Sequence, residues 1–87
     1  MSPPVPPPAR FELLTRAGCH LCDDMARLLD DVLLGRGLAY AAVDVDGDAE
    51  LRARFGDTVP VLLRDGVPVA KVRLDRTRLE RILHRKR

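Results

Sequence analysis

The sequence feature that most constrains the fold is a pair of cysteines, Cys19 and Cys22, where a short apolar stretch gives way to a helical pattern. Residues three apart on a helix are neighbours, about 5–6 Å from each other, and a disulfide needs a similar Cα separation. The chain has no other cysteine, whereas small secreted domains carry several pairs spread along the sequence. The pattern therefore predicts redox or metal chemistry at the start of a helix.

The residues around the cysteines predict a strand–helix–strand unit. A short apolar strand is expected over 11–15. Apolar residues at spacings of three and four then predict a helix over 20–34, ended by Gly35. A second strand is expected over 38–45, and this order of elements makes the two strands parallel. The apolar stripe of the helix consists of Leu21, Met25, Leu28, Leu29, Val32 and Leu33.

The second half of the chain predicts a short helix, a hairpin and a final helix. Asp48 can cap the short helix. Two strands over 61–63 and 69–73 are joined at Asp65-Gly66, a strong signal for a tight hairpin. Asp75 can cap the last helix. The element order β-α-β-(α)-β-β-α predicts an α/β fold with a four-stranded mixed sheet flanked by helices.

Length and composition indicate one small domain. The chain has 87 residues and a net charge of +2, which does not indicate a nucleic-acid partner. Residues 1–9 are rich in proline and predict a disordered tail, so the domain is expected over 10–87. No apolar run is long enough to cross a membrane, and the amino terminus does not resemble a secretory signal. We therefore expect a cytoplasmic monomer without membrane contact.

The two cysteines are expected to differ in reactivity. Cys19 lies at the helix start, where free N–H groups stabilise a thiolate, so it is the expected low-pKa nucleophile. Cys22 lies within the first turn and is expected to be the buried, resolving thiol. His20 adds a polar group beside Cys19, either as an exposed residue that tunes the thiolate or as a general base.

A second motif, Thr58-Val59-Pro60, opens the third predicted strand. An X–Pro bond is the one peptide bond in which the cis form is accessible at low cost. A cis bond at Val59-Pro60 would turn the backbone of Val59 toward the cysteines. An extended substrate could then pair with that backbone as an added strand.

Together, the opening Gly18-Cys19-His20-Leu21-Cys22, the tripeptide Thr58-Val59-Pro60 and the element order resemble a glutaredoxin-like protein of the thioredoxin superfamily. The resemblance covers residues 11 to about 84 and implies the thioredoxin-like fold. It also implies that Cys19 is the nucleophile, that Cys22 resolves the mixed disulfide and that Pro60 is the cis-proline.

The same resemblance implies a binding site for glutathione. Arg16 matches a basic position that contacts the glycyl carboxylate, and Val59 matches the residue whose backbone pairs with the cysteinyl part. Glutaredoxins carry a glycine pair before the last helix, where the γ-glutamyl end binds. This chain has Val72-Arg73-Leu74-Asp75 there, so that only Asp75 could supply a polar contact.

Three functions are compatible with these residues. The first is a thiol–disulfide oxidoreductase that acts on protein or small-molecule disulfides, including glutathione mixed disulfides. Its reductant would be glutathione, as a co-substrate, or a reductase of the thioredoxin-reductase type. The second is a zinc site, for which Cys19, Cys22, His20 and His84 are the only cysteine and histidine ligands. The third is a non-catalytic binding module. We expect the first, with no bound cofactor and no metal.

Overall fold

A computed structural model of the chain describes residues 9–84. Its helices and strands follow in the order β1 (Phe11–Thr15), α1 (His20–Val32), β2 (Tyr40–Asp44), α2 (Ala49–Phe55), β3 (Val61–Arg64), β4 (Val67–Lys71) and α3 (Arg76–His84). Short 3-10 turns at Leu34–Arg36 and Val45–Gly47 follow α1 and β2. The predicted disordered tail lies outside the described residues except for Ala9, which packs against the core.

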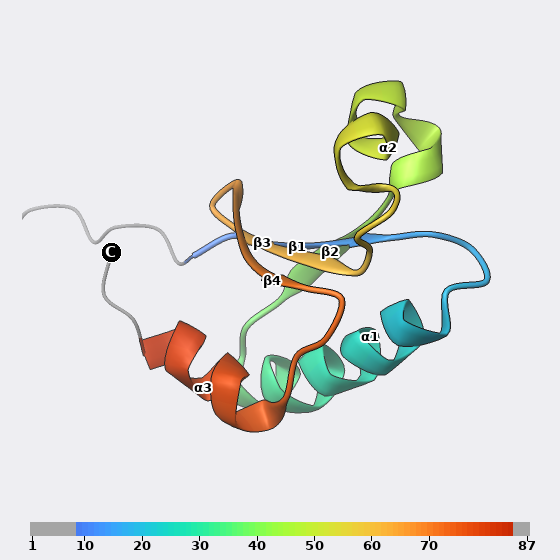
Figure 1. The fold of residues 1–87 in the computed structure, drawn as a ribbon. Helices are drawn as coiled ribbons and strands as arrows, with labels where there is room; N and C mark the ends of the chain where they lie inside the picture. Colours follow the sequence, from blue (N-terminus) through green and yellow to red (C-terminus); the bar gives the residue numbers. More distant parts are fainter. Residues whose placement is uncertain (1–8, 85–87) are drawn as a thin grey trace, which may run out of the picture.

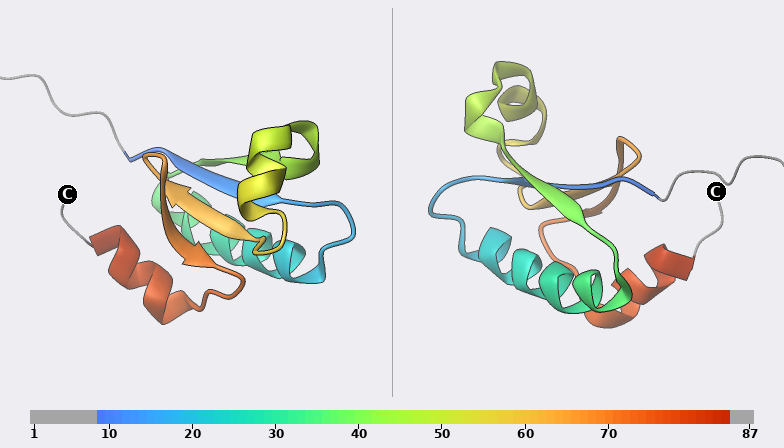
Figure 2. Two further views of the ribbon diagram at one scale, coloured as in Figure 1. Left: turned by 45° about the horizontal axis from the view of Figure 1, so that its top comes forward. Right: turned by 180° about the vertical axis from the view of Figure 1, so that it is seen from behind.

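The four strands form one mixed sheet in the order β2-β1-β3-β4. β1 pairs with β2 in parallel, and β3 pairs with β1 and β4 in antiparallel orientation. The predicted strand–helix–strand unit and the predicted four-stranded mixed sheet are both confirmed. Figure 1 shows the sheet nearly edge-on, with α1 and α3 on one side and α2 on the other. The two further views in Figure 2 show the same layering.

Side chains alternate between the two faces of the sheet, and this alternation divides the core in two. On the face toward α1 and α3, Leu13 of β1 packs in one cluster with Leu29 of α1 and Leu79 of α3. On the other face, Leu14 packs in a second cluster that includes Phe55 of α2. The larger cluster anchors α1 against the sheet, and α1 carries the cysteine motif at its amino-terminal end.

Several element boundaries differ from the sequence prediction, including the end of β3 at Arg64 and the end of β4 at Lys71. Helix α1 ends at Val32 rather than at 34, because the chain tightens into a 3-10 turn before Gly37, whose φ is +72°. The second strand is shorter than predicted and covers Tyr40–Asp44. Strand β4 begins at Val67, two residues early, because Asp65 and Gly66 both have positive φ and form a two-residue hairpin turn. These shifts leave the topology unchanged.

No helix within residues 9–84 is long and apolar enough to cross a membrane.

Candidate redox site

Cys19 is the N-cap of α1, as the sequence predicts, and it is joined to Cys22 by a disulfide. The Cα atoms of the two cysteines are 5.2 Å apart, within the usual range for a disulfide. The backbone N–H of Cys22 donates a hydrogen bond to Cys19 Sγ over 3.0 Å. Gly18, with a φ of +72°, supplies the left-handed turn that brings the chain from β1 into α1. The strand-to-helix turn therefore places both sulfurs at the first turn of α1.

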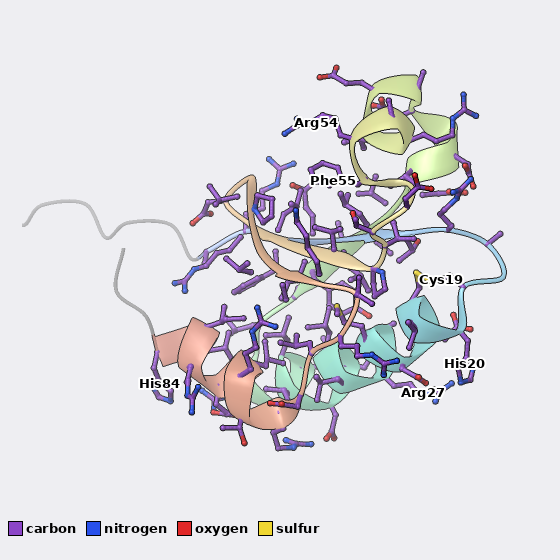
Figure 3. The ribbon with its side chains drawn as sticks, viewed as in Figure 1. Cys19, His20, Arg27, Arg54, Phe55 and His84 are labelled. Atoms are coloured by element: carbon purple, nitrogen blue, oxygen red, sulfur yellow. A yellow bond between two sulfur atoms is a disulfide. The ribbon has the colours of Figure 1, made fainter. Side chains whose placement is uncertain are left out.

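The two cysteines differ in exposure in the direction that the sequence predicts. Cys22 is buried, with 2% of its surface exposed, while Cys19 is half-buried. In Figure 3 the Cys19 sulfur lies at the start of α1 on the side of the sheet, whereas His20 points away from it. The sulfur that an incoming reactant can reach first is thus that of Cys19.

His20 is largely exposed, with 84% of its side chain accessible, and its Nε2 lies 3.7 Å from Asp24. His84 lies on α3, far from the cysteines (Figure 3), and its Nε2 is 3.9 Å from Glu80. Within residues 9–84, no group of three or more histidine, cysteine or acidic side chains is placed to hold a metal ion. The described residues therefore do not assemble the zinc site that the sequence left open.

The Val59-Pro60 bond is cis, which confirms the sequence prediction. Pro60 is fully buried, and Val59 is half-buried against the cluster under α2. The N–H and hydroxyl of Thr58 both donate to the carbonyl of Phe55, over 2.9 and 3.2 Å. At the other end, the N–H of Val72 donates to the carbonyl of Pro60 over 2.7 Å. The loop is thus fastened to α2 and to the segment that follows β4.

Arg16, three residues before Cys19, forms contacts within the protein. Its Nε and Nη2 donate to the two carboxylate oxygens of Asp46, over 3.2 and 2.9 Å. Its Nη1 donates to the carbonyl of Gly56 over 3.1 Å. The hydrogen bonds and the charge of Asp46 raise the pKa of Arg16. The guanidinium therefore connects the loop before Cys19 with the turn after β2 and the end of α2.

A cavity of about 400 Å³ lies between α1 and the turn that joins β4 to α3. Leu21, between the two cysteines, lines it from α1, and residues 72–75 and Arg78 line it from the opposite side. Asp75 is in this lining, and its carboxylate also accepts a hydrogen bond from the N–H of Arg78 over 2.8 Å, as the predicted cap of α3. Two of the proposed ligand residues are thus placed differently: Asp75 borders the cysteine motif, while Arg16 is paired with Asp46.

Sequence reasoning missed Val72 as a site residue. It lines the cavity with a φ of +67°, a conformation rare for a β-branched residue. Its only sequence signal is its position, because it stands where the resemblance places a glycine pair. Asp46, the partner of Arg16, was also missed, because no local pattern links residues 30 positions apart.

Comparison with known proteins identifies a family and a fold. A family described as the glutaredoxin-like domain (DUF836) matches residues 10–84. An uncharacterized protein of Mycobacterium tuberculosis is 44% identical over 62 residues, which is 66% of this chain. The aligned part spans 64% of that relative's own length.

Solved structures give a consistent result. A protein of Nitrosomonas europaea, solved by NMR, superposes with a TM-score of 0.75 at 26% identity, covering 95% of this chain and 99% of its own. A crystal structure of a protein from X. campestris superposes with a TM-score of 0.71 at 33% identity, covering 84% of this chain and 93% of its own. A thioredoxin variant from Halobacterium salinarum superposes with a TM-score of 0.61 at 24% identity, covering 86% of this chain and 71% of its own. The last likeness concerns the fold alone.

Proposed function

Because the chain belongs to the glutaredoxin-like domain family and has a thioredoxin-like fold, we propose that it is a thiol–disulfide oxidoreductase. The observation that carries the proposal is the Cys19–Cys22 disulfide at the start of α1, with one sulfur buried and the other accessible. A buried structural bridge would not need this inequality. A dithiol that reacts in two ordered steps does need it.

The reaction begins from the reduced protein. The Cys19 thiolate attacks one sulfur of a substrate disulfide, forms a mixed disulfide and expels the other substrate sulfur as a thiolate, which takes up a proton. Cys22 then loses its proton and attacks Cys19 Sγ, which releases the second substrate thiol and closes the Cys19–Cys22 bond. Two electrons pass to the substrate, and an external dithiol or glutathione must supply two electrons to reopen the bond.

The chain's own groups support the first step. The Cys22 N–H that points at Cys19 Sγ, over 3.0 Å, is a donor suited to a sulfur that carries negative charge. His20 points away from the Cys19 sulfur and toward Asp24, which does not favour the general-base alternative, so we assign it a modest electrostatic role. The loop of Thr58, Val59 and Pro60 is the proposed docking edge for an extended substrate.

The proposed substrates are disulfides of proteins and mixed disulfides of proteins with glutathione. Because Arg16 is paired with Asp46, the residues proposed to contact glutathione are Val59 and Asp75. The reducing cytoplasm, where glutathione and thioredoxin systems operate, is the proposed compartment.

A turnover assay separates this function from a non-catalytic binding module. Reduced protein with excess dithiothreitol should reduce a protein disulfide such as that of insulin faster than dithiothreitol alone. Cys19→Ser should abolish the gain. Cys22→Ser, reduced and freed of dithiothreitol before it is mixed with the substrate, should accumulate a mixed disulfide through Cys19, visible by mass. Circular dichroism of both variants controls for folding. If the wild-type protein gives no gain and traps no substrate, it is not an oxidoreductase for such disulfides.

The order of the two thiols is tested separately. Limited alkylation of the reduced protein near neutral pH should label Cys19 first, because Cys22 is buried. Preferential labelling of Cys22 would reverse the two roles.

A further inference from the structure

The guanidinium of Arg16 makes its hydrogen bonds within the protein. Each of its three nitrogens donates a hydrogen bond, two to Asp46 and one to the carbonyl of Gly56. The contact with Asp46 is bidentate, which is the strongest geometry between a guanidinium and a carboxylate. Two of the five N–H donors of the guanidinium are left, but a second carboxylate would meet a guanidinium whose charge Asp46 already offsets. The cation closest in sequence to Cys19 on its amino-terminal side is therefore already neutralised.

The fold positions both partners of Arg16. Asp46 lies in the turn after β2, where its N–H donates to Asp44 over 2.9 Å. Gly56 ends α2, and a Cβ at this position would meet the carbonyl of Arg52 at 2.6 Å and Arg16 Nη1 at 3.4 Å. A side chain at this position would therefore disturb the end of α2, whose carbonyl at Gly56 accepts from Arg16. The pair is still accessible to solvent, since 37% of the Arg16 side chain and 39% of the Asp46 side chain are exposed.

We propose that Asp46 is a specificity-determining residue: it acts as an internal carboxylate that occupies Arg16, so that the site beside Cys19 disfavours small disulfides carrying carboxylates. The favoured substrate is then an internal segment of a polypeptide, which presents amides rather than a terminal carboxylate. This inference rests on the proposed function and narrows its substrate class toward protein disulfides and away from glutathione.

Two chromogenic disulfides of similar reactivity and opposite charge character test it. Dithiobis(nitrobenzoate) carries carboxylates, and dithiodipyridine is uncharged at neutral pH. In a Cys22→Ser background only Cys19 can react. The measured quantity is the second-order rate constant for dithiobis(nitrobenzoate) divided by that for dithiodipyridine. It is measured at low ionic strength, where electrostatic effects are largest.

Asp46→Asn should raise this ratio about two- to fivefold, the range expected for freeing one exposed charge pair. Asp57→Asn is the matched control, because Asp57 acts on Arg16 only through its charge and makes no hydrogen bond to it. Its effect on the ratio should be clearly smaller. The double variant Asp46→Asn with Arg16→Gln should lose the gain, because the gain requires a freed guanidinium. Asp46→Ser repeats the test with a different side chain, and circular dichroism verifies folding of each variant.

Three results would overturn the inference. They are an unchanged ratio in both Asp46 variants, an equal rise in Asp57→Asn, and a gain that persists in the double variant. None of these results depends on turnover. A wild-type protein that fails the insulin assay but shows the Asp46-dependent ratio would refute the proposed function and support this inference.

Discussion

Val72 is a site where the backbone conformation makes a sharp prediction about stability. Its φ is +67°, its N–H donates to the carbonyl of Pro60 over 2.7 Å, and 37% of its surface is exposed. For a residue with a Cβ, the left-handed conformation costs about 1–2 kcal/mol. Glycine avoids that cost but loses about 0.4–1 kcal/mol more through the entropy of the unfolded chain. The difference leaves Val72→Gly more stable than Val72→Ala by about 1 kcal/mol.

Val69 in β4 is the matched control, since it is a valine of the same segment and its φ is not positive. Glycine within a strand is less stable than alanine by about 0.5–1 kcal/mol. The sign of the glycine–alanine difference should therefore reverse between Val69 and Val72. Both variants of each pair lose the valine methyl groups, so the comparison cancels most of the lost packing.

Urea denaturation and thermal melting of the four variants measure this reversal. A difference of 1 kcal/mol corresponds to about 4–8 °C in Tm for a domain of this size. If Val72→Ala is as stable as Val72→Gly or more stable, Val72 does not adopt the left-handed conformation in solution. The same result would contradict the backbone conformation described here for the turn beside the cavity.

Three further perturbations test the fold that carries the site. Leu29→Ala should lower the free energy of unfolding by about 2.7–5 kcal/mol in urea, because Leu29 is fully buried between α1 and the sheet; a loss below 1 kcal/mol would contradict that packing. Asp48→Ala should cost about 0.5–2 kcal/mol and Asp48→Asn much less, because the Asp48 carboxylate accepts hydrogen bonds from two N–H groups at the start of α2; equal losses would show that capping is not involved. Burial and the hydrogen bond to Asp30 raise the pKa of Tyr40 to about 12. The unfolded chain then loses its phenolic proton first, so the contribution of Tyr40 to stability is complete below about pH 10 and is lost as the pH rises toward 12. Tyr40 is the only tyrosine and there is no tryptophan, so ultraviolet absorbance reports it alone; a midpoint near 10 in folded protein would contradict its burial.

The topology could be predicted from sequence because the local signals agree with one another. The apolar stripe on α1, the glycines after it and the Asp65-Gly66 turn each specify a local conformation that the sheet then accommodates. The strand boundaries were less predictable. β4 begins two residues early because the hairpin uses the shortest turn. It ends at Lys71, because the left-handed conformation of Val72 interrupts the ladder.

The site could be predicted only as far as its residues are close in sequence. Cys19 and Cys22 form one helical turn, and the cis bond of Val59-Pro60 is a property of one dipeptide. The partner of Arg16 depends on how the turn after β2 lies beside the loop before Cys19, which only the packing of β1 against β2 determines. For the same reason the cavity between α1 and the β4–α3 turn has no signature in either segment alone.

The most direct test of redox function is the intact mass of the protein equilibrated in thiol redox buffers whose potentials span about −300 to −120 mV. We predict a single reversible transition in which Cys19 and Cys22 together lose two hydrogens, and neither variant, Cys19→Ser or Cys22→Ser, should show it as an intramolecular step. A wild-type mass that stays constant across the series, or a protein that holds stoichiometric zinc while neither thiol titrates, would contradict the assignment of this pair as a redox centre.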